Sequence, residues 1–115
     1  MLKTIPDLIK LASEHVVKID AAQAKSEIAK NNGLLIDVRE PAEHAIKNAV
    51  GAINIPRGVL EMKLVEIEKD AERPIYLHCA TGGRATLAAE QLQRIGYNKV
   101  TVISCKAENV CDTFC

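Results

Sequence analysis

The sequence predicts an α/β fold in which helices cover both faces of a largely parallel sheet. Short apolar segments alternate with segments of helical spacing, and the connections between them are short. Such alternation is typical of parallel sheets, because their successive strands are joined by helices. The length of 115 residues and the hydrophobic content of 48% fit one domain, residues 1–115, with a core of its own.

The first third of the chain reads as helix, strand and helix. Thr4-Ile5-Pro6-Asp7 is a typical helix start, so a leading helix is predicted within residues 1–15. A short β-prone segment, Val16–Ile19, follows. Asp20–Gln23 then resembles a capping box, and it opens a second helix that ends near Asn31-Asn32-Gly33.

The middle of the chain continues the alternation. Leu34–Val38 has the apolar character of a buried strand, and Glu40-Pro41 starts a short helix. Ala52–Ile55 can form a strand, which Pro56 would stop. Val59–Glu68 has helical spacing with charged residues on its outer face.

The last third begins with the apolar strand Ile75–His78, which breaks at Cys79 into a loop. An Ala- and Leu-rich helix is predicted over Ala85–Ile95, with Gly96 as its natural C-cap. Lys99–Ile103 is rich in β-branched residues and is predicted to be the last strand.

The loop that starts at Cys79 is predicted to hold a reactive sulfur anion. Gly82 and Gly83 allow backbone N–H groups to turn inward, and the following helix adds the positive end of its dipole. Arg84 adds a permanent positive charge. Such surroundings lower a cysteine pKa from about 8.5 to roughly 3.5–7.5, and the thiolate is the nucleophile. A free cysteine is more often a small buried hydrophobe, but the strand, loop and helix together favour a nucleophilic Cys79.

Charge and composition argue against several classes of function. The chain has 15 basic and 15 acidic side chains and no net charge, which predicts no nucleic-acid or membrane-surface partner. No segment approaches the about 18 apolar residues of a membrane span, and a signal-peptide core is lacking, so we expect a cytoplasmic protein. The four cysteines are too few for a disulfide scaffold and are expected to be free thiols.

Two stretches of the chain resemble the rhodanese family of sulfurtransferases. Leu35–Glu43, followed by Gly51–Pro56, is similar to the first signature of that family, and Cys79–Arg84 is similar to its six-residue active-site loop. The resemblance implies a rhodanese-like three-layer α/β/α fold with a central sheet of five mostly parallel strands. The implied strand order is 3-2-4-5-1, with the strand before Cys79 in the middle.

The resemblance also implies the chemistry. Cys79 would take a sulfane sulfur from thiosulfate, a persulfide or a polysulfide and pass it to a thiophilic acceptor, such as cyanide or a protein thiol. Inward-facing N–H groups of the loop would hold the persulfide, and neither a cofactor nor a metal is implied. Only Arg84 in the loop offers charge to thiosulfate, whose turnover is therefore expected to be modest. The substrate-binding residues implied are Ala80, Thr81, Gly82, Gly83 and Arg84.

The implied strand order brings further residues near the loop. Asp37, Arg39 and Cys105 follow strands two and five, which lie about 4.8 Å from their neighbours, so these residues should flank the loop. Asp37 and Arg39 could form an ordinary ion pair at the strand end, whereas the resemblance implies that they brace the loop or the substrate edge; neither is expected to be catalytic. Cys105 could resolve a persulfide through a disulfide with Cys79, which requires Cα atoms within about 7 Å. His78 is predicted to pack on the opposite side of its strand.

Three alternatives to sulfur transfer stay open. Phosphatases of the same fold place arginine six positions after the cysteine; here position 85 is alanine and Arg84 comes one residue early, so the loop is expected to be too tight for a phosphoryl group. A non-catalytic rhodanese-like binding module is disfavoured by the presence of Cys79. A thiol-redox role would use Cys79 with Cys105 or the tail cysteines. A metal-handling role would use Cys105 with Cys111 and Cys115, whose spacing matches no standard zinc pattern.

The tail, residues 105–115, departs from the family. It has no tryptophan and lacks the usual Gly-Gly pair after the fifth strand, so the closing helix is expected to be short or replaced. Cys111 and Cys115 are four residues apart and are expected to share an apolar helix face beside Val110 or Phe114.

Overall fold

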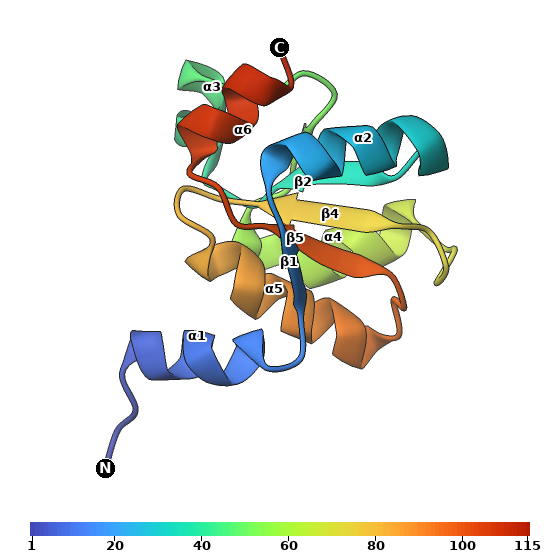
Figure 1. Ribbon diagram of the computed structural model, residues 1–115. Coiled ribbons are helices and arrows are strands. Elements are labelled where there is room, and N and C mark those ends of the chain that lie inside the picture. The colour runs from blue at the N-terminus through green and yellow to red at the C-terminus, as the bar shows by residue number, and fades with distance from the viewer.

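The computed structural model, which describes residues 1–115, contains a five-stranded sheet with helices on both faces (Figure 1). All neighbouring strands are parallel, and the strand order is β1-β5-β4-β2-β3. Read from the other edge, this is the predicted order 3-2-4-5-1, so the fold class is confirmed. The strands are β1 (Val17–Ile19), β2 (Leu34–Asp37), β3 (Ile53–Asn54), β4 (Ile75–His78) and β5 (Val100–Ile103).

The central strand β4 explains why the strands read as continuous apolar runs. All four of its residues are buried, because helices cover it on both sides. Successive side chains alternate between the two faces. Ile75 and Leu77 pack in one cluster, together with Cys79, and Tyr76 packs in a second cluster on the opposite face.

The helices divide between these two faces. α4 and α5 contribute to the cluster that contains Cys79, and α1 lies beneath α5 (Figure 1). α2 and α6 contribute to the opposite cluster, and α3 lies on that side as well. The helices are α1 (Ile5–Ser13), α2 (Ala21–Asn31), α3 (Pro41–Ile46), α4 (Leu60–Ile67), α5 (Gly83–Ile95) and α6 (Ala107–Thr113), with a 3₁₀ turn, η1 (Arg57–Val59), before α4.

Local capping signals fix most helix ends, with one correction. Thr4 caps α1 as predicted and forms a full capping box with Asp7. Asp20 accepts a hydrogen bond from the Gln23 backbone N–H, but the Gln23 side chain donates to Glu27 instead of returning to the cap. The capping box predicted there is therefore only half formed, because the side chain found a partner one turn further along α2.

The tail also differs in part from the expectation. The closing helix α6 is short, as predicted, and the backbone N–H of Ala107 donates to the carbonyl of Ala80 at 3.0 Å. The prediction that Cys111 and Cys115 share a helix face is wrong. Cys111 is buried within α6, but the helix ends at Thr113 and Cys115 is exposed beyond it.

None of the helices combines the length and the apolar character that crossing a membrane requires.

Candidate functional site

The sulfur of Cys79 lies in a cradle of backbone N–H groups. The residue follows β4 and is 1% exposed. Its Sγ accepts hydrogen bonds from the backbone N–H of Gly82 at 3.1 Å and of Ala85 at 3.4 Å. The second donor lies one residue outside the predicted loop. The predicted helix start at Ala85 could have indicated this donor, because the N–H groups in the first turn of any helix lack helical acceptors.

Other N–H groups of this segment are left without an acceptor. Those of Ala80, Thr81, Gly83 and Arg84 donate to no protein acceptor, and the latter two belong to the first turn of α5. Gly82 has φ +98°, a left-handed conformation that side chains rarely adopt, and it allows the loop to turn into the helix. The loop can therefore stabilise one added anionic atom on Cys79 without any charged side chain.

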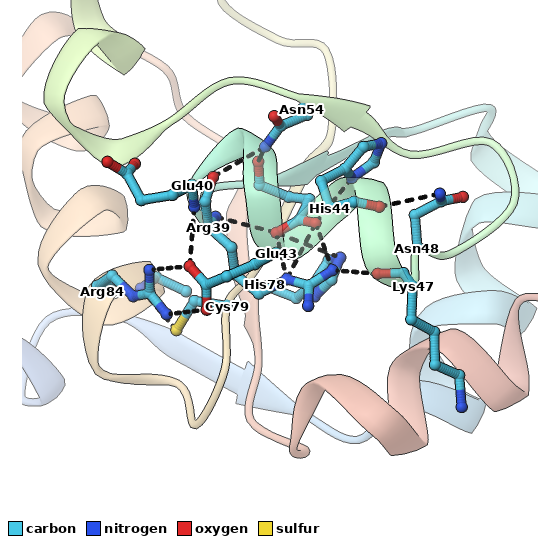
Figure 2. Close-up of polar contacts among 12 residues, drawn as sticks. Arg39, Glu40, Glu43, His44, Lys47, Asn48, Asn54, His78, Cys79 and Arg84 are labelled. Carbon is cyan, nitrogen blue, oxygen red and sulfur yellow. Dashed lines mark hydrogen bonds and ion pairs between the residues drawn. The ribbon is translucent and has the colours of Figure 1, made fainter.

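Arg84 differs from the expectation, because its charge is already compensated. Its guanidinium donates to both carboxylate oxygens of Glu43, at 2.8 and 3.0 Å, as Figure 2 shows. This bond, helped by the backbone N–H of Glu40, lowers the pKa of Glu43 to about 2. Sequence reasoning did not identify Glu43, which lies 41 residues away on α3. The expectation of a free cation at the loop is thus corrected to a paired one.

Asp37 and Arg39 form a buried ion pair at the end of β2. Arg39 Nη2 lies 2.8 Å from Asp37 Oδ2, and Asp37 is fully buried. Burial alone would raise the pKa of Asp37, but hydrogen bonds with Arg39 and His44 outweigh it and hold this pKa below its ordinary value. The expected ion pair is therefore present.

This pair also holds α3 in place. His44 Nδ1 lies 2.9 Å from the Asp37 carboxylate, and Arg39 donates to the backbone carbonyl of Lys47 at 2.7 Å. His44 is within α3 and Lys47 ends it. Because Glu43 lies on the same helix, the ion pair supports the position from which Glu43 binds Arg84. Contacts through α3 thus connect Asp37 and Arg39 to Arg84 of the loop.

His78 behaves as a packing residue. It is fully buried, and neither ring nitrogen has a hydrogen-bond partner. Its Nε2 lies 4.0 Å from the Asp37 carboxylate. Burial lowers the pKa of His78, so the ring is neutral near pH 7. No hydrogen bond joins its ring to the Cys79 sulfur, which accepts from Gly82 and Ala85.

Cys105 does not face Cys79. Its Sγ accepts a hydrogen bond from the Ala21 backbone N–H at 3.3 Å, at the start of α2, and it packs against the cluster on the α2 and α6 face. Cys79 belongs to the cluster on the other face. A disulfide between the two would require one of them to leave its face of the sheet, so the arrangement does not support a resolving role for Cys105.

We expect the Glu43–Arg84 pair to stabilise the fold at neutral pH and to fail in acid. The pKa of Glu43 falls from its ordinary 4.5 to about 2 on folding, so its contribution is complete above about pH 4.5 and is lost as the pH falls toward 2. Both side chains are 37% exposed, so the effect is small. The measurement is the denaturation midpoint of the wild type and Glu43→Gln at pH 7 and pH 2. The difference in midpoint between the wild type and Glu43→Gln should be smaller at pH 2 than at pH 7. An equal difference at both pH values would contradict the ion pair's proposed contribution.

Comparison with known proteins gives one consistent family. The family model of the Rhodanese-like domain matches residues 20–108. A protein named sulfurtransferase from Allochromatium vinosum is 31% identical over 86 residues, which cover 74% of this chain and 78% of that protein. The uncharacterized protein YqhL of Bacillus subtilis is 39% identical over 66 residues, 57% of this chain. This chain matches only 51% of the length of YqhL, about half of it.

A solved structure agrees with these relatives. The solution structure of the polysulfide-sulfur transferase homodimer from Wolinella succinogenes matches with a TM-score of 0.73 at 25% identity. The match covers 92% of this chain and 80% of that one. The similarity therefore extends beyond the region that the family model matches.

Proposed function

This chain belongs to the rhodanese-like domain family, and on that premise we propose that it transfers sulfane sulfur through a persulfide on Cys79. The relative named sulfurtransferase supports a role of this type. The observation that carries the proposal is the cradle around Cys79. Two N–H groups already bind its sulfur, and those of Ala80, Thr81, Gly83 and Arg84 have no protein acceptor.

The proposed reaction has two steps. In the first, the Cys79 thiolate attacks the outer sulfur of a donor such as thiosulfate, the sulfur–sulfur bond of the donor breaks, and sulfite leaves with the electron pair. The cysteine then carries a persulfide anion, whose charge the free N–H groups bind. In the second, cyanide or an acceptor thiolate attacks the terminal sulfur, and the Cys79 thiolate leaves. No general base is needed when the thiol is already ionised, and the kinetics are ping-pong.

The donors that this site favours are persulfides and polysulfides over thiosulfate. Arg84 is the only cationic side chain of the loop, and Glu43 compensates its charge. The compact dianion thiosulfate thus gains little from it, whereas an organic persulfide is a monoanion and a polysulfide spreads its charge along a longer sulfur chain. The similar protein from Wolinella succinogenes is a polysulfide-sulfur transferase, which agrees with this preference. A protein thiol is the proposed physiological acceptor.

A phosphatase is disfavoured by the same contacts. Such an enzyme needs an arginine to bind the phosphoryl oxygens, and here the guanidinium of Arg84 already binds both oxygens of a carboxylate. At position 85, where the arginine of the phosphatase pattern would stand, Ala85 is fully buried and its N–H is directed to the sulfur. These contacts favour one extra sulfur atom over a tetrahedral group.

The test is peptide mass spectrometry after incubation with polysulfide and, separately, with thiosulfate. We expect the mass of one sulfur atom on the Cys79 peptide, and its loss after cyanide is added. Absence of the adduct with both donors would contradict the proposal and favour a binding module.

A further inference from the structure

Helix α1 touches the cysteine loop. It lies beneath α5, whose first residue, Gly83, belongs to that loop (Figure 1). A Cβ atom added to Gly83 would lie 3.0 Å from Ile9 Cδ1 and 4.0 Å from Ile9 Cγ1, so this side chain rests on the loop backbone. Gly82 and Ala85, on either side of Gly83, donate to the Cys79 sulfur. Ile9 therefore meets the loop between the two donors of the sulfur cradle.

The two sides of the loop differ in chemistry. On the α3 side, Arg84 and Glu43 compensate each other. On the α1 side, the contact is the aliphatic side chain of Ile9, which is only partly exposed. An apolar group that enters beside the loop and covers Ile9 is removed from water, which is favourable, whereas an anionic oxygen in contact with the same side chain gains no hydrogen bond from it.

We infer that Ile9 is a specificity-determining residue: it forms an apolar wall of the Cys79 site and selects sulfane-sulfur donors that carry an organic apolar group, such as aryl or alkyl thiosulfonates and persulfides, over thiosulfate. This inference rests on the proposed function, because it concerns the donor of the same transfer. It adds to that function a residue outside the segment, 20–108, that the family model matches.

Two probes isolate the effect of the apolar group. Benzenethiosulfonate and thiosulfate present the same outer sulfur to Cys79, but a phenyl ring in the first replaces an anionic oxygen in the second. With benzenethiosulfonate, the Cys79 thiolate bonds to the outer sulfur, the sulfur–sulfur bond breaks, and benzenesulfinate leaves with the electron pair. Cyanide then removes the terminal sulfur as thiocyanate and restores the thiolate.

The experiment measures kcat/KM for both donors with the wild type and with Ile9→Ala, using cyanide as the acceptor. We expect Ile9→Ala to lower kcat/KM for benzenethiosulfonate by about three- to tenfold, since it removes apolar contact with the ring, and to change the value for thiosulfate by less than about twofold. Leu11→Ala is the matched control. Leu11 lies on the same helix, is 45% exposed and faces the groove that Arg57 and Arg94 also line. Leu11→Ala should leave the ratio of the kcat/KM values for the two donors unchanged.

If Ile9→Ala leaves the ratio of kcat/KM for benzenethiosulfonate to kcat/KM for thiosulfate unchanged, the inference is overturned. Ile9 would then act only on stability. Should Ile9→Ala fail to fold, Ile9→Val removes only the contacting Cδ1 atom, and it should shift the ratio by about twofold in the same direction. A wild type that forms no Cys79 persulfide with either donor would contradict the proposed function itself, a result that mass spectrometry distinguishes from a change in donor ratio.

Discussion

Cys79→Ser is expected to abolish sulfur transfer, with turnover at the level of the uncatalysed reaction. The serine hydroxyl is not ionised near neutral pH and cannot form a persulfide, so the first step is lost entirely. The replacement is otherwise conservative, because the hydroxyl can still accept from the Gly82 and Ala85 N–H groups that bind the sulfur in the wild type. The measurement is thiocyanate production from polysulfide and cyanide, together with the mass of the peptide that contains position 79.

Two other cysteine variants are the controls for this result. Cys105 packs on the opposite face of the sheet, where its sulfur accepts from the Ala21 N–H, and Cys115 is exposed beyond α6. Cys105→Ser and Cys115→Ser are therefore expected to retain turnover. If Cys79→Ser stayed active while Cys105→Ser lost activity, the nucleophile would be Cys105 and the proposed reaction would be wrong.

Asp37→Asn is expected to give the largest loss of stability among the site variants. The change keeps the size of the side chain but removes the charge that compensates Arg39, a cation that is only 6% exposed. Breaking a buried ion pair in this way costs about 3 kcal/mol or more. For a domain of this size that lowers the thermal midpoint by roughly 10 °C or more. Thermal denaturation followed by circular dichroism measures it.

A surface ion pair provides the comparison. Lys47 and Asp112 also pair, at 2.7 Å, but their side chains are 48% and 61% exposed. Asp112→Asn removes the same charge as Asp37→Asn, and it should leave the midpoint near that of the wild type, because water solvates both groups once they separate. Equal midpoints for the two variants would show that burial of the Asp37–Arg39 pair does not matter for stability.

The sequence alone was sufficient to predict those features that depend on residues close together in the chain. Thr4, Asp20 and Gly96 mark helix ends through interactions within a few residues, and the structure has helix ends at all three. Largely apolar runs identified the inner strands β2 and β4, because inner strands of a parallel sheet are buried on both faces. The loop after Cys79 could also be located, since a strand, a Gly-Gly pair and a helix in succession form a contiguous pattern.

The tertiary structure alone decided which partners these local elements meet. The pairing of Arg84 with Glu43 joins residues 41 positions apart, and the contact of Ile9 with Gly83 joins the first helix to the fifth. The face on which Cys105 lies depends on how the chain turns after β5, which no periodicity encodes. These contacts follow from the packing of helices on the sheet, and the free energy that selects them is a property of the whole core. The reactive cysteine could thus be identified from the sequence, whereas the charge and apolar surface around it depend on the folded chain.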